Sequence, residues 1–386
     1  MSVRVLAFFD TRYQSAEDVR RLAGGRDPWQ DLRDARPASR QHFPLNLPST
    51  LGMYDLADPT QASAVIAMAA SAGIDGFVIE CQWAEDRYVS GAAALKAAAP
   101  PGFVLAYTWL NEPESPWWDT ASPPQQRARI ADLIAAIKPN GGDERVVLIV
   151  DAPQRDSIGD IVKLLRTEAE SAGLPGLMLI ANRAEDKGRF LAVGFDALID
   201  PGPAAWHSCP PNNRPSGLDY LEVMAGLKDS AEYLDKFFPY VLFAVTRMIN
   251  REDRGRVLPR VFPSFHNWAR HVDGGATHLV SHGNRAIDTH MFGLFMENAM
   301  LAAYQGFAEG ERFVFLESWN NWLDGSQIEP SQLDGYLVYD ATRAAIDRAR
   351  YVIRTRAGLP ENGIDAAMRE RIDLLCDAAR DIDTKV

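Results

Sequence analysis

Eight short apolar runs alternate with helical patterns along this chain, and that alternation limits the fold more than any other feature. Helical patterns cover residues 59–73, 125–138, 160–173, 291–305 and 341–356. The apolar runs, which we expect to be strands, begin at Val3, Gly76, Phe103, Arg145, Leu177, Ala197, Arg256 and Arg312. Eight strands joined by helical crossovers predict an α/β fold of the (β/α)8 TIM-barrel type.

A doubly wound open sheet is the competing fold. Such sheets carry a glycine-rich phosphate loop after the first strand, whereas here Phe9-Asp10-Thr11-Arg12 follows it. We therefore expect one barrel over residues 1–358 and a helical extension over 359–386. One face of that helix is apolar, and packing on the barrel is expected, with a homodimer contact as the alternative. The face comprises Ile364, Met368, Ile372, Leu375, Ala379 and Ile382.

Composition excludes several classes of partner. The 386 residues carry a net charge of −12 without a Lys/Arg-rich run, so a nucleic-acid partner is not expected. No apolar run approaches the roughly 20 residues of a membrane span. The first residues, MSVRVLAFF, resemble a buried strand more than a signal peptide. Three widely spaced cysteines (81, 209 and 376) indicate a reducing, cytoplasmic setting without a zinc site, and no cofactor is expected.

Polar and aromatic residues collect where the predicted strands end. In a (β/α)8 barrel the active site lies at the C-terminal ends of the strands, so these residues should converge. Carboxylates, amides and indoles together are typical of a carbohydrate site. The residues are Glu80, Gln82, Trp83, Tyr107, Trp109, Asn111, Glu112, Asp151, Asn182, Asp200, His266, Asn267, Trp268, Arg270 and the stretch 317–324.

Several ordered motifs resemble one known family. They include LGMYDLADP (from Leu51), AGIDGFVIECQW (Ala72), TWLNEPESPWWD (Thr108), FPSFHNWAR (Phe262) and ESWNNWLDGSQIEP (Glu317). Together they are similar to motifs of the WbsX-like glycosyltransferases, relatives of glycoside hydrolase family 99. The resemblance implies a TIM barrel acting on glycans. For WbsX-like members it implies bacterial surface-polysaccharide or O-antigen assembly, and for family 99 it implies endo-acting hydrolysis of mannose-type chains.

The sequence departs from that family at the positions of its chemistry. The resemblance places the two catalytic glutamates of the hydrolases at Asn321 and Asp324, an aspartate of the seventh-strand motif at His266, and a histidine after the second strand at Cys81. An amide cannot accept a proton at neutral pH, and Asp324 is one methylene shorter than glutamate. Conventional hydrolysis should therefore fall by about 10⁴–10⁶-fold.

Other groups could take over the proton transfer. Glu317 and Asp324 form one hypothetical carboxylate pair, although Glu317 could instead be a buried acid paired with an arginine. His266, oriented by Asn267, is a further acid–base candidate. The expected substrate contacts are Glu80, Trp83, Tyr107, Trp109, Asn111, Glu112, Asn267, Arg270, Trp319, Asn320, Trp322 and Glu329.

Three functions remain open from sequence. The first is a glycosyltransferase of surface-polysaccharide synthesis, in which Arg12 and Arg270 would hold the phosphates of a nucleotide-sugar donor. The second is a family 99-like hydrolase that acts on an oligosaccharide with rearranged carboxylates. The third is a non-catalytic oligosaccharide-binding or scaffold barrel.

Overall fold

The computed structural model describes most of the chain. The described residues are 3–22, 25–34, 46–84, 87–110, 117–139, 145–151, 156–182, 187–200, 202, 255–263, 265–266, 279–280, 289–357 and 363–383.

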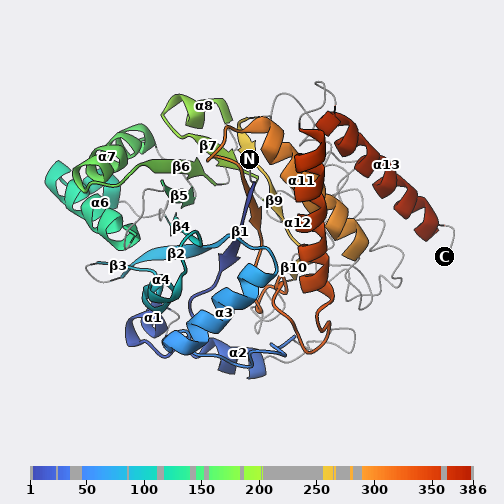
Figure 1. The fold of residues 1–386 in the computed structure, drawn as a ribbon. Coiled ribbons are helices and arrows are strands. Elements are labelled where there is room, and N and C mark those ends of the chain that lie inside the picture. Colours follow the sequence, from blue (N-terminus) through green and yellow to red (C-terminus); the bar gives the residue numbers. More distant parts are fainter. Residues whose placement is uncertain are drawn as a thin grey trace.

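Parallel strands form a closed barrel (Figure 1). Around it the order is β8-β7-β6-β5-β4-β2-β1-β12-β9. The strands are β1 (Arg4–Phe9), β2 (Gly76–Ala84), β4 (Val104–Leu110), β5 (Val146–Asp151), β6 (Leu177–Ala181), β7 (Ala197–Ile199), β8 (Val257–Leu258), β9 (Arg260–Val261) and β12 (Phe313–Leu316). All neighbours in this order pair in parallel.

A single stretch of chain closes the barrel. β8 and β9 are consecutive segments separated by Pro259, which has no N–H to give to a ladder. β8 pairs with β7, β9 pairs with β12, and the Pro259 carbonyl accepts a 2.9 Å bond from Phe315 N. Residues 257–261 therefore act as one strand position. Each of the eight predicted runs supplies one such position, which confirms the (β/α)8 prediction.

Helices surround the strands, with α6 and α7 on one side and α11 and α12 on the other in Figure 1. A hairpin strand, β3 (Arg87–Val89), pairs antiparallel with β2, and β10 (Phe265–His266) pairs with β11 (Leu279–Val280). The helices are α1 (Glu17–Leu22), α2 (Pro28–Asp34), α3 (Pro59–Ser71), α4 (Ala93–Ala98), α5 (Trp117–Thr120), α6 (Pro123–Ile137), α7 (Ile158–Ser171), α8 (Lys187–Ala192), α11 (Thr289–Gly306), α12 (Leu337–Arg356) and α13 (Gly363–Asp383).

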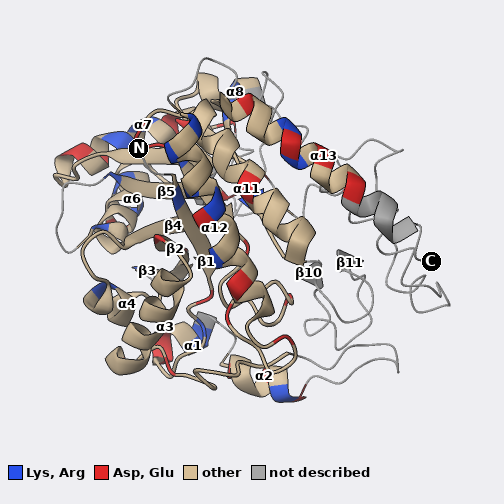
Figure 2. Ribbon diagram, turned by 45° about the vertical axis from the view of Figure 1, so that its right-hand side comes forward, with Lys and Arg blue, Asp and Glu red and all other residues tan. Residues whose placement is uncertain are grey.

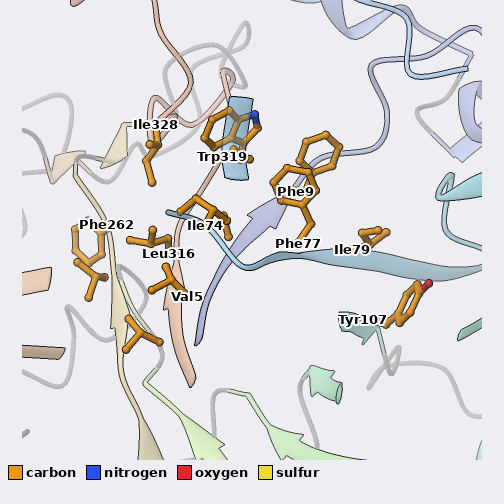
Figure 3. Close-up of a cluster of buried hydrophobic side chains, with 14 of the residues drawn as sticks. Val5, Phe9, Ile74, Phe77, Ile79, Tyr107, Phe262, Leu316, Trp319 and Ile328 are labelled. Carbon is orange, nitrogen blue, oxygen red and sulfur yellow. The ribbon is translucent and has the colours of Figure 1, made fainter. Parts of the chain in front are cut away.

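Strand alternation divides the core in two. Successive side chains of a strand point to opposite faces, so every second residue enters the barrel and the others meet the helices. The inner core includes Leu6, Val78, Ala106, Ile149, Ile180 and Phe315. The outer core includes the intervening residues, and Figure 3 shows part of it, with Val5, Phe77, Tyr107, Leu316 and Trp319.

Helix α13 packs against α11 and α12. Ile364, Met368 and Leu375 of its predicted apolar face are buried. At the contact, Glu297 of α11 accepts bonds from Arg348 Nε (2.6 Å) and Arg371 Nε (2.7 Å). A carboxylate that is 3% exposed is thus paired on both sides.

Acidic and basic residues intersperse along α12 and α13 (Figure 2). Among the described residues, no helix has the length and apolar character needed to cross a bilayer. The side chains of Ala379 and Ile382 lie outside the described residues. The boundary between barrel and helical extension at residue 358 stays a prediction, as does the homodimer contact.

Gly76 permits the close approach of β2 and β4. A Cβ built at this position would lie 2.2 Å from the Val104 carbonyl oxygen and 2.9 Å from Leu6 Cδ2. The carbonyl belongs to the backbone of the neighbouring strand, so a side chain at residue 76 would push the barrel open.

We expect Gly76→Ala to lower the free energy of unfolding by about 1–3 kcal/mol, the usual cost of overpacking, or to prevent folding. Urea denaturation followed by circular dichroism measures this. Gly159→Ala is the matched control, because its added Cβ would meet Val193 at an ordinary 3.6 Å inside α7. Equal midpoints for the two variants would contradict the strand-contact explanation.

Candidate functional site

A cavity of about 410 Å³ opens at the C-terminal ends of the barrel strands. Polar residues line it where the inner apolar rows end. In β4, Val104 and Ala106 belong to the inner core and Thr108 reaches the cavity, and in β12 Phe315 is succeeded by Glu317. The same alternation brings the inward-facing residues Asp10, Glu80, Thr108, Asp151, Asn182, Arg260 and Glu317 to one cavity.

Glu317 lines the cavity and also pairs with an arginine. Arg260 Nη2 lies 2.7 Å from Glu317 Oε2, and both side chains are largely buried. The Arg260 guanidinium stacks 4.3 Å above the Phe8 ring. Gly202 makes room for it, because a Cβ there would lie 2.7 Å from Arg260 Cδ at a left-handed φ of +61°. The arginine-paired alternative for Glu317 is therefore observed, while its pairing with Asp324 as a catalytic carboxylate stays a prediction.

Asn321 holds Asp324 in place. Its Nδ2 donates to Asp324 Oδ2 at 2.7 Å, while its backbone N donates to Ser318 Oγ at 2.8 Å. Both side chains line the cavity, and Asp324 is only 7% exposed. The amide that stands where the hydrolases have a glutamate thus orients the neighbouring carboxylate.

Arg12 is also paired with an acid. Its Nε donates to Asp10 Oδ1 at 2.9 Å and its Nη2 to Oδ2 at 2.6 Å. The negative charge of Asp10 in this bidentate contact raises the pKa of Arg12 above its ordinary value. Arg12 and Arg260 are the two arginines of the described cavity lining, and both face carboxylates. Five carboxylates share the same lining, from Asp10, Glu80, Asp151, Glu317 and Asp324.

Tyr107, Trp109 and Trp83 do not line the cavity, which differs from the expectation from sequence. Tyr107 and Trp109 alternate with Thr108 and so face the helices, each 1% exposed. Trp109 packs edge-on against Trp118, with ring centroids 5.5 Å apart. Trp83 stacks under the Arg129 guanidinium at 4.3 Å. These rings pack the outer core.

The β12 loop shows the same division. Trp319 and Trp322 are 0% and 1% exposed and belong to the outer core (Figure 3 labels Trp319). Asn320 is fully buried, and it accepts from Asp10 N at 2.8 Å and donates to Asp10 O at 2.9 Å. It therefore fixes the backbone of the β1 loop.

Glu329 completes a buried chain of hydrogen bonds. Asn320 Nδ2 donates to Tyr54 Oη at 3.0 Å, and Tyr54 Oη donates to Glu329 Oε2 at 2.9 Å. Burial raises the pKa of Glu329 to about 8 and holds that of Tyr54 well above its ordinary value. Glu329 thus supports the β1 and β12 loops from outside the cavity.

Several predicted site residues lie outside the described part of the chain. These are Asn111, Glu112, Asn267 and Arg270. The backbone of His266 lies in β10, and its side chain is not described. Their roles stay predictions.

Cys81 is fully buried, and burial raises its pKa to about 12, so its thiol stays protonated. Within the described ranges, no three His, Cys, Asp or Glu side chains are placed to hold a metal ion.

Asp10, Thr108 and Arg260 line the cavity without having been predicted as substrate contacts. Strand parity could have identified them. Each lies an even number of residues after an inner apolar position: Asp10 after Phe8, Thr108 after Ala106, and Arg260 after Leu258.

Comparison with known proteins places these features in context. The family model for glycosyltransferase WbsX matches residues 13–342. A protein described as uncharacterized protein WxcX, from two strains of Xanthomonas campestris pv. campestris, is 22% and 21% identical over 352 residues. The match covers 83% of this chain and 46% of the relative, so the chain spans about half the length of the curated relatives it matches.

Solved structures share the fold. A glycoside hydrolase-like protein has a TM-score of 0.53 at 14% identity, covering 89% of this chain and 94% of that one. The GH99 endo-α-mannosidase from Bacteroides thetaiotaomicron in complex with Bis-Tris propane has a TM-score of 0.51 at 14% identity, covering 90% and 97%. A second structure of the GH99 endo-α-mannosidase from Bacteroides thetaiotaomicron has a TM-score of 0.50 at 12% identity, covering 90% of this chain and 98% of that one.

The fold and its strand-end cavity define a (β/α)8 barrel with a carboxylate-rich cavity at the C-terminal ends of its strands. More particularly, the chain belongs to the WbsX glycosyltransferase family, whose model matches most of its length.

Ionisation of Glu329 should make the fold less stable as pH rises. Its folded pKa of about 8 exceeds the ordinary 4.5, so the folded state holds the proton more tightly. The resulting stability is present below about pH 4.5, declines as pH rises, and is lost above about pH 8. Glu329→Gln should therefore gain stability relative to wild type across this window, as measured by urea denaturation from pH 5 to pH 9.

Glu17→Gln controls for the lost negative charge, because its side chain is 80% exposed. A Glu329→Gln variant that is less stable than wild type at pH 9 would contradict the assignment.

Proposed function

We propose that this chain transfers a glycosyl unit in the assembly of a bacterial surface polysaccharide, acting in the cytoplasm. The observation that carries the proposal is the gathering of Glu317, Asn321 and Asp324 at one acidic cavity within a WbsX-family barrel. The description of the family as glycosyltransferases supports transfer. The curated relatives are about twice as long as the part that this chain matches. Any activity of a full-length protein of that size is therefore also part of this proposal.

Asp324 is the group best placed to act as the base. In transfer, the hydroxyl oxygen of the acceptor attacks the anomeric carbon of the donor, the bond to the leaving group breaks, and the hydroxyl proton must be accepted. Asp324 would accept it, oriented by Asn321 Nδ2. Glu317 is held by Arg260, so its charge would instead stabilise positive charge that develops on the sugar ring.

Hydrolysis of a neutral glycan is the second candidate, and the charge of the cavity favours it. Both arginines of the described lining face carboxylates, so neither presents an uncompensated charge to a nucleoside diphosphate. A neutral glycoside has no such requirement. The family 99 fold of the similar structures is consistent with this candidate.

Two incubations separate these candidates. One supplies nucleotide sugars with and without an oligosaccharide acceptor, and the other supplies oligomannosides alone. Nucleotide release that requires the acceptor supports transfer, whereas shortened oligomannosides support hydrolysis. Binding without either reaction supports the scaffold hypothesis. Bis-Tris propane, which is bound in one of the similar structures, is a convenient first probe of binding.

Asp324→Asn should lower the rate of whichever reaction is found by about 10²–10⁴-fold, since it removes a positioned base while keeping size and shape. Initial rates at saturating substrate measure the loss. Asp347→Asn, at an exposed position of α12, removes the same charge away from the cavity and should leave the rate unchanged. An active Asp324→Asn enzyme would assign the base to another group.

A further inference from the structure

A second polar wall faces the β12 carboxylates across the cavity. Three strand positions separate β5 from β12 in either direction around the barrel: β1, β2 and β4 on one side, and β6, β7 and the β8–β9 stretch on the other. Asp151 ends β5, and register places its neighbours beside it. Leu110 of β4 pairs with Asp151, and Asn182 follows the Val150–Ala181 pair. Thr108, Asp151 and Asn182 therefore form one wall, opposite Glu317.

Two atoms of this wall have unused hydrogen-bonding capacity. Thr108 Oγ1 and Asn182 Oδ1 are buried, and neither has a hydrogen-bond partner among the described residues. The two residues are 7% and 4% exposed, and both line the cavity. Buried polar atoms are rarely left without partners, because their desolvation is then uncompensated. A ligand in the cavity would supply the missing partners.

The amide of Asn182 has a defined orientation. Its Nδ2 donates to Asp151 Oδ1 at 2.8 Å. The reverse orientation would place the amide oxygen against a carboxylate oxygen, which is repulsive, so charge selects the observed one. Asn182 Oδ1 is thereby presented as a hydrogen-bond acceptor beside the carboxylate of Asp151.

The fold itself does not require these polar groups. The inner positions before Thr108 are Val104 and Ala106, and those before Asn182 are Met178 and Ile180. An apolar residue at 108 would continue the inner core without an unpaired hydroxyl. The polar residue appears at the layer that meets the cavity, which points to a binding purpose.

The other side of the cavity offers a donor. Arg260 Nε is buried without a hydrogen-bond partner among the described residues, although Nη2 of the same guanidinium pairs with Glu317. Acceptors thus line one wall and a donor the other. A sugar hydroxyl both donates and accepts, so a pyranose ring could satisfy the two walls together.

We propose that Thr108, Asp151 and Asn182 form a hydroxyl-recognition subsite, which binds two neighbouring hydroxyl groups of an uncharged sugar ring and presents the opposite edge of that ring to Asp324. This inference rests on the proposed glycan activity and adds the residues that select the sugar. Asp151 and Asn182 Oδ1 accept from the hydroxyl hydrogens, and Thr108 Oγ1 bonds one of the same hydroxyls. The subsite therefore distinguishes sugars by the positions of their hydroxyls.

Calorimetric titration tests the subsite. The probes are methyl glycosides of common hexoses and 6-deoxyhexoses, the oligomannosides, and monodeoxy analogues of any sugar that binds. Thr108→Val and Asn182→Ala should each weaken binding about 3- to 10-fold, the usual effect of one neutral hydrogen bond. Deleting the matching sugar hydroxyl should weaken binding to wild type by a similar factor but have little further effect on Thr108→Val.

Two controls separate binding from stability. Thr108→Ser keeps the hydroxyl and should bind like wild type. Thr108→Val should unfold at a temperature no lower than wild type, because it removes a buried hydroxyl without a partner among the described residues. A loss of stability in Thr108→Val would instead indicate a structural hydroxyl and overturn the proposal.

The outcomes also distinguish the subsite from the function on which it rests. If a sugar binds and Thr108→Val and Asn182→Ala bind it equally well, only the subsite fails. If no sugar binds wild type, the glycan activity and the subsite fail together. Non-additive losses from the deoxy sugar and the substituted side chain would establish the direct contact.

Discussion

Closure of a parallel sheet onto itself gives every strand residue one of two environments, and the site depends on that division. Inward positions meet the opposite strands, and outward positions meet the helices. The inner rows are apolar at the closed end, with Leu6, Ile149 and Phe315 among them, and become polar where the cavity opens. Carboxylates and amides from distant parts of the chain are therefore brought to one rim by the ladders of the barrel strands and by the loops that directly follow them.

Supporting contacts outside the cavity position the two loops that carry most of its charge. Asn320 binds both backbone polar groups of Asp10, while Tyr54 joins Asn320 to Glu329. The β1 loop, which carries Asp10 and Arg12, is thus coupled to the β12 loop, which carries Asp324. The fully buried Trp319 packs the same region of the outer core. Residues of the β12 motif therefore divide between cavity and support.

Sequence patterns predicted the fold well and the cavity only in part, for a reason that lies in the strands themselves. Apolar runs and helical periods located all eight barrel strand positions. Glu80, Glu317, Asn321 and Asp324 were named from strand ends and lie at the cavity. However, Tyr107 and Trp109 were predicted as substrate contacts because of their aromatic side chains, whereas strand alternation places Thr108 at the cavity. Their large rings fill the space between β4 and its helices, where the volume is available.

Pairings between distant residues could not be predicted in the same way. The Arg260–Glu317 ion pair depends on the parallel register of β9 and β12, and the Asn320–Tyr54 bond joins residues 266 positions apart. No local pattern encodes such contacts. They are nonetheless decisive for chemistry, because they determine which of several carboxylates is held by an arginine and which by an amide.

The substitution of an amide at 321 is coherent with this distribution of charge. A glutamate there would place a further anion beside Asp324, which is nearly buried, in a cavity where both described arginines already face acids. The amide instead donates a 2.7 Å hydrogen bond to Asp324 Oδ2, which fixes the orientation of that carboxylate. The loop after β12 thereby holds one oriented carboxylate at a pair of positions where two carboxylates would repel each other, and it retains a group that can accept the proton of an attacking hydroxyl.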